Sequence, residues 1–126
     1  MEPYVNYPRQ KMLATQSSTA NIPNQGITRL TALSTYTLDA PVKGALKTIY
    51  RSASMSTAAS VVNAGSGRSF NSAGGTQVLL LQPTTVGGGM DIGVTLIGES
   101  SVQWRIMSAF PGVAADSTGS GIRVTT

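Results

Sequence analysis

Met90-Asp91-Ile92-Gly93-Val94-Thr95-Leu96 is the stretch in which the chain alternates most regularly between apolar residues and small or polar ones. Successive side chains of a β-strand point to opposite faces, so the four apolar residues of this stretch share one face. After Gly98 the alternation resumes in residues 102–106, which places the sole tryptophan, Trp104, among apolar neighbours. Both stretches predict strands with one buried face. Trp104 is expected in the core, and an exposed sugar-stacking platform is the alternative.

Further strand patterns lie on the N-terminal side of these two. Residues 30–38 are rich in threonine and in aromatic or branched side chains, and residues 45–51 alternate between two faces. Residues 76–82 form an apolar run that is expected to be buried on both faces. Residues 56–63 predict a shorter strand, because their serine and β-branched residues disfavour a helix. Glycine and proline turns separate these segments, which favours an all-β fold, an antiparallel sandwich or barrel.

The basic residues suggest a surface for an acidic partner. Nine lysines and arginines face five acidic residues, for a net charge of +4, and charged residues make up only 11% of the chain. Such low charge favours association, because self-repulsion is weak. Lys47 and Arg51 fall on one face of the strand over residues 45–51, in a stripe with Lys43. We expect this stripe either to contact an acidic neighbouring subunit or to be a solvated face. Clustered cations with interleaved aromatics are lacking, so no direct nucleic-acid contact is expected.

Three regions follow from composition. Residues 1–28 predict an extended N-terminal arm, since their prolines and polar residues show no apolar period. Residues 29–110 predict the β core, and residues 111–126 predict a C-terminal strand or tail. Apolar residues spaced along the arm are typical of a segment that docks on a neighbouring surface, and a frayed terminus is the alternative. The arm residues expected to contact a partner are Tyr4, Tyr7, Arg9 and Lys11.

The commonest general base and metal ligand, histidine, and the thiolate nucleophile, cysteine, are both missing. The chain contains no histidine and no cysteine, which excludes a Ser-His-Asp or Cys-His site within it. Asp91 and Glu99 are the nearest two carboxylates, and a straight strand would hold them roughly 26 Å apart, too far for paired acid catalysis. The glycine-rich residues 65–69 lack the Gly-Lys-Ser/Thr tripeptide of a phosphate loop. We therefore expect no enzyme activity, no metal and no cofactor.

Targeting signals are also lacking. The first residues contain no apolar secretory segment, and no apolar run approaches the ~20 residues needed to span a bilayer. The expected protein is therefore soluble, made inside the cell, and without a membrane partner.

Two stretches carry a family resemblance. Residues 38–50 (LDAPVKGALKTIY) and residues 96–104 (LIGESSVQW) flank a middle that is rich in glycine and serine. This layout resembles that of small β-rich structural proteins of tailed bacteriophages, especially capsid decoration or cement proteins. It is a similarity of layout, so no functional residue is carried over by position. It implies a jelly-roll or β-tulip-like fold, a homo-oligomer such as a trimer, and a place on the virion after synthesis in the host cytoplasm.

The predicted function is accordingly that of a non-enzymatic virion protein. The resemblance implies binding to the outside of a shell of major capsid protein, where the chain stabilises contacts between adjacent subunits. Extended arms suit this task because several weak contacts multiply one another. Two alternatives stay open: a carbohydrate- or receptor-binding module of a phage fibre, and a neck or tail joining protein.

Overall fold

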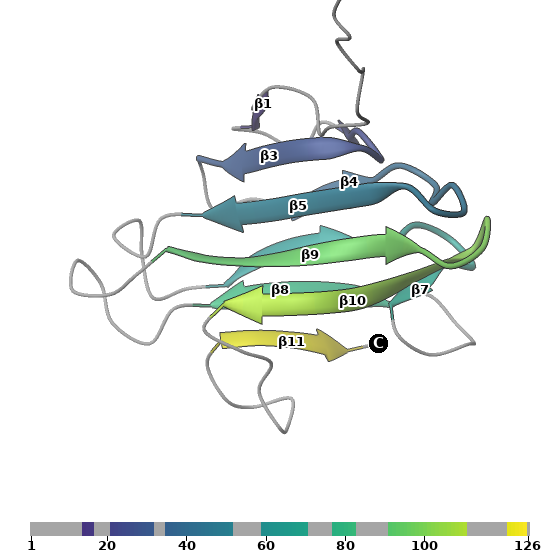
Figure 1. Cartoon of the computed structure of the whole chain (residues 1–126). Coiled ribbons are helices and arrows are strands. Elements are labelled where there is room, and N and C mark those ends of the chain that lie inside the picture. Colours follow the sequence, from purple (N-terminus) through teal and green to yellow (C-terminus); the bar gives the residue numbers. More distant parts are fainter. Residues whose placement is uncertain are drawn as a thin grey trace, which may run out of the picture.

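Two mixed β-sheets pack face to face in the computed structural model (Figure 1). The structure describes residues 14–16, 21–31, 35–51, 59–70, 77–82, 91–110 and 121–125. Sheet A has the order β1 (Ala14–Gln16), β3 (Gly26–Leu30), β5 (Leu46–Arg51), β9 (Ile92–Gly98), β10 (Gln103–Phe110), β7 (Ser69–Phe70). Sheet B has the order β11 (Gly121–Thr125), β8 (Val78–Gln82), β6 (Ser60–Asn63), β4 (Thr35–Leu38), β2 (Asn21–Ile22). The predicted all-β sandwich is confirmed.

The first half of the chain winds around the core. Strands β1, β3 and β5 lie side by side and parallel in sheet A, while β2, β4 and β6 do the same in sheet B. Each turn of this winding adds one strand to each sheet, so neighbouring strands run in the same direction. The second half adds antiparallel pairs, including the β9–β10 hairpin. The sheets are therefore mixed, and not purely antiparallel as the strand spacing predicted.

This winding corrects three expectations. The single strand predicted over residues 30–38 is wrong, because β3 ends at Leu30 and β4 begins at Thr35 in the opposite sheet. The predicted arm of residues 1–28 overlaps the core, since it contains β1, β2 and part of β3, and Ile22 is fully buried. The apolar run of β8 is buried on one face only, where Leu79 and Leu81 point inward.

The predicted alternation of the later strands is confirmed. In β9, Ile92, Val94 and Leu96 are buried. Of the two alternatives for residues 111–126, a strand or a tail, the strand is present as β11 at the edge of sheet B. The predicted strand over residues 56–63 is present as β6 in its last four residues, while residues 52–58 lie outside the described part of the chain.

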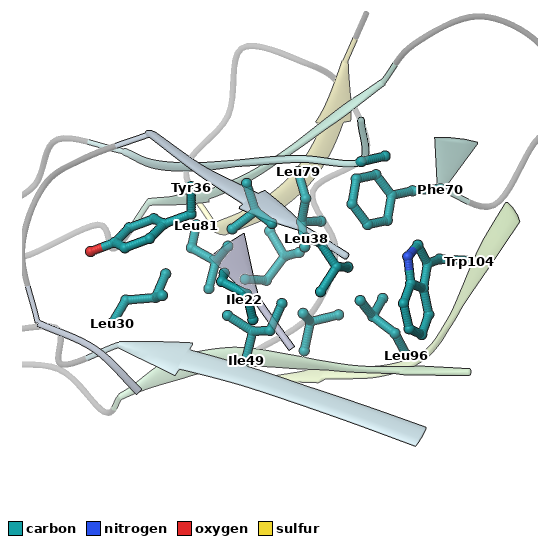
Figure 2. Packing of buried hydrophobic residues seen from close by; sticks show 14 of the residues in the cluster. Ile22, Leu30, Tyr36, Leu38, Ile49, Phe70, Leu79, Leu81, Leu96 and Trp104 are labelled. Atoms are coloured by element: carbon teal, nitrogen blue, oxygen red, sulfur yellow. The ribbon is translucent and has the colours of Figure 1, made fainter. Parts of the chain in front are cut away.

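Trp104 closes one end of the core. It is fully buried and lies near Phe70 and Leu96 in Figure 2, which shows Leu30 and Tyr36 at the opposite end of the cluster. Its indole N–H has no hydrogen-bond acceptor among the described residues, so its role here is packing. The predicted core position is confirmed, and the side chain has no exposed ring face on which a sugar would stack.

We predict that Trp104→Ala lowers the free energy of unfolding by about 3–5 kcal/mol, because it leaves a large cavity in the core. Denaturant unfolding followed by circular dichroism measures the change. Val102→Ala is the control: Val102 precedes the same strand but is 53% exposed, so a loss within about 0.5 kcal/mol is expected. Equal stability of Trp104→Ala and the unmodified chain would contradict this packing.

Candidate functional site

The inner face of β5 holds two basic side chains where a core strand normally places apolar ones. Lys47 is 1% exposed and Arg51 is 0% exposed, on either side of the buried Ile49. The prediction that Lys47 and Arg51 share one face of this strand is confirmed, whereas Lys43 is exposed in the preceding turn and does not continue the stripe. The expectation that Lys47 and Arg51 reach a partner or the solvent is wrong, because this face points into the sandwich. The sequence signal was ambiguous, since alternation alone does not say which face is buried.

Lys47 ties β5 to the start of β3. Its Nζ donates hydrogen bonds to the backbone oxygen of Gln25 at 3.1 Å and to Oγ1 of Thr28 at 2.6 Å. Burial lowers the pKa of Lys47 from 10.5 to about 8, and the negative charge of Asp39 opposes part of that effect. The ammonium group therefore holds the corner between β2 and β3 in place at an electrostatic cost.

Arg51 ties sheet A to sheet B. One guanidinium nitrogen, Nη1, donates to Oγ of Ser60 in β6 at 3.1 Å and to the backbone oxygen of Leu81 in β8 at 3.2 Å. Burial lowers the pKa of Arg51, while its electrostatic interaction with Tyr36 acts in the opposite direction. Both cations are thus occupied in structural hydrogen bonds inside the fold.

Groups for acid–base or metal chemistry do not converge in the described part of the chain. No three potential metal-binding side chains lie together among those residues. Asp91 and Glu99 sit at the two ends of β9, separated by the whole strand, as the extended geometry predicted. Glu99 is instead bound by Arg105, whose Nε and Nη2 donate to its two carboxylate oxygens at 2.7 Å each. This exposed pair contributes little stability, because solvent screens it.

The outer face of sheet A presents apolar and aromatic side chains, and we treat it as the candidate site. Strand register aligns three rows across it. The first row runs Leu46, Ile97, Arg105; the second runs Ile27, Thr48, Thr95, Ser108; the third runs Arg29, Tyr50, Gly93, Phe110. In the middle row the Oγ1 atoms of Thr48 and Thr95 lie 3.1 Å apart in a hydrogen bond. Leu46 is 42% exposed and Phe110 is 38% exposed.

Gly93 makes room for the aromatic row. A Cβ atom at this position would collide with the ring tip of Phe110 and would lie 2.6 Å from Cβ of Tyr50. The Phe110 ring therefore reaches over β9 toward Tyr50, and a larger residue at position 93 would push it away. The local sequence gives no signal for this contact, because it depends on the register between β9 and β10.

The remaining predicted contact residues fall outside the described part of the chain. These residues are Tyr4, Tyr7, Arg9 and Lys11. Strand β1 begins at Ala14 and lies at the edge of sheet A beside β3. The predicted arm residues thus precede an edge strand of the sheet that carries the candidate site.

No protein-family model matches the chain, and no match was found to a curated protein or to a solved structure. Within the described residues, no helix has the length and apolar character required to cross a bilayer.

We predict that the unmodified protein gains stability as the pH rises from 8 to 10.5. In this window the unfolded chain binds a proton at Lys47 that the folded chain has already released, so the free energy of unfolding increases. The gain attributable to Lys47 is at most about 3 kcal/mol. Lys47→Met removes that part of the slope, which denaturant unfolding at several pH values measures.

Lys43→Met provides the matched control, because Lys43 is exposed in the turn before β5. This variant is expected to keep the slope of the unmodified protein. If Lys47→Met and Lys43→Met show the same pH dependence, the buried ammonium of Lys47 does not control it.

Proposed function

We propose that the chain is a non-enzymatic structural protein of a tailed-phage particle, which binds the outside of the capsid and stabilises contacts between major capsid subunits. The layout of residues 38–50 and 96–104 supports this proposal. The all-β fold also supports it, because its two buried cations are engaged in hydrogen bonds within the fold. The observation that carries it is the outer face of sheet A, where the side chains of Leu46 and Phe110 are exposed.

The face has the composition of a protein contact. Leu46 and Ile97 form an apolar patch beside the Glu99–Arg105 ion pair, and Tyr50 and Phe110 form an aromatic patch beside Arg29. Aromatic residues and arginine are enriched where proteins bind proteins. A partner that covers exposed apolar groups removes them from water, which stabilises the complex. Between the two patches, the hydroxyl groups of Thr48, Thr95 and Ser108 offer hydrogen-bonding groups to the same partner.

The outer face of sheet A is too small to form a stable interface by itself. Four strands spaced about 4.8 Å apart and about six residues long cover roughly 400 Å². A stable interface buries about 800 Å² on each partner. A second contact is therefore required, and we assign it to the predicted arm, which precedes β1 at the edge of sheet A.

We predict that Leu46→Glu weakens binding to empty shells of the phage's major capsid protein at least tenfold, because it places an unpaired charge in an apolar contact. Co-sedimentation with the shells measures the change. Thr35→Glu is the control, since Thr35 is exposed on β4 in sheet B and adds the same charge to the opposite side of the sandwich. Equal loss in both variants would show that the outer face of sheet A is not the contact.

We also predict that removing residues 1–13 leaves a folded protein that binds the shells poorly. The cut precedes β1, so every described strand is kept, whereas a cut after residue 25 would also delete β1 and β2. Circular dichroism checks the fold and co-sedimentation checks binding. Full shell binding by the shortened, folded chain would remove the arm from the proposed contact.

A further inference from the structure

The four edges of the two sheets are not equally protected against further pairing. Edge strands β1, β7 and β2 are three, two and two residues long. Strand β10 pairs with β7 only at Gln103 and Trp104, and a bulge between Ile106 and Ser108 interrupts its later residues. Short strands and bulges are common devices that stop a sheet edge from binding another strand.

Strand β11 has neither device. It is five residues long and pairs with β8 in five consecutive positions without a register shift. Among the described strands, β8 is the one that pairs with β11 through backbone hydrogen bonds. The other side of β11 carries a row of backbone N–H and C=O groups with which no described strand pairs. Gly121–Thr125 is therefore the edge best suited to accept an added strand.

The core is also incompletely covered along this side. Three partly buried hydrophobic residues pack against the described core cluster, and all three lie on β10 or β11: Ile106, Ala109 and Val124. These two strands form the same border of the sandwich, at the bottom of Figure 1. Met107, on β10, is 60% exposed. A strand added to β11 would cover part of this apolar seam.

We propose that β11 pairs with β11 of a second copy of the chain, antiparallel about a twofold axis, so that two five-stranded sheets become one of ten strands. The added strand must turn apolar residues toward the seam and polar ones away from it. Strand β11 meets this need itself, because Ile122 and Val124 occupy the core-facing positions and alternate with Arg123 and Thr125. Symmetric pairing then satisfies both open edges at once.

Charge selects the register of this pairing. A twofold axis centred on Arg123 would place two arginines directly opposite each other, which is unfavourable in a strand pair. An axis centred on Val124 places Val124 opposite Val124 of the second copy and Arg123 opposite Thr125 of the second copy. The second register also joins two apolar side chains at the seam, so we assign the axis to Val124.

Cysteine cross-linking tests both the pairing and its register. The chain has no cysteine, so Val124→Cys introduces a single thiol. Directly opposed residues of a strand pair have Cβ atoms about 4.5–5.5 Å apart, close to the separation in a disulfide. Mild oxidation is expected to convert Val124→Cys to a covalent dimer at least tenfold faster than Ile122→Cys or Val42→Cys. Cross-linking of Val42→Cys at the same rate would overturn the pairing, because Val42 is an exposed turn residue.

Light scattering during size-exclusion chromatography tests the association without a cross-link. The unmodified chain is expected to show a dimer mass that falls toward the monomer on dilution. Val124→Lys is expected to weaken the dimer at least tenfold, whereas Val42→Lys, which makes the same change at an exposed site, leaves it intact. A monomer at every concentration, or a trimer, would overturn the twofold pairing. If Val124→Lys fails to fold by circular dichroism, the cross-linking rates decide.

Discussion

The guanidinium group of Arg51 crosses the core from β5 of sheet A and binds β6 and β8 of sheet B. Dispersion contacts between the two sheets have no preferred direction, whereas hydrogen bonds to a hydroxyl and to a backbone oxygen do. A buried cation also makes any other alignment costly, because it would lose its acceptors inside the protein. Arg51 therefore gives the relative placement of the two sheets a directional constraint that the apolar contacts do not supply.

Strand β5 is also where the two halves of the fold meet. On one side it pairs in parallel with β3, and on the other it pairs antiparallel with β9. Lys47 binds the first half of the chain through hydrogen bonds to Gln25 and Thr28. Arg51 binds sheet B through a hydrogen bond to the backbone oxygen of Leu81. With its inner face engaged in this way, β5 contributes to contacts outside the molecule only through its outer residues, including Leu46 and Tyr50.

The local alternation of apolar and polar residues was enough to predict most strands, but not which strands pair with each other in the two sheets. The patterns of β5 and β9 follow directly from side-chain periodicity, and so does the core position of Trp104. The crossing between sheets after Leu30 could not be predicted, because threonine-rich residues continue through the break. Lys47 and Arg51 were misplaced for a related reason: the acceptors that make their burial tolerable lie on β3, β6 and β8, far away in sequence.

The proposed pairing at β11 and the outer face of sheet A use different parts of the sandwich, and the symmetry links them. A twofold axis perpendicular to sheet B rotates the second copy within the plane of that sheet. Sheet A therefore lies on the same side of the joined sheet in both copies. The two outer faces of sheet A would then point in one direction. Each face covers too little area for a stable contact. Two faces held on one continuous sheet would bind a repetitive surface together, because the second contact gains from its high effective concentration. A shell of identical subunits is such a surface, which is why a strand-paired dimer would strengthen the weak contact expected of one copy.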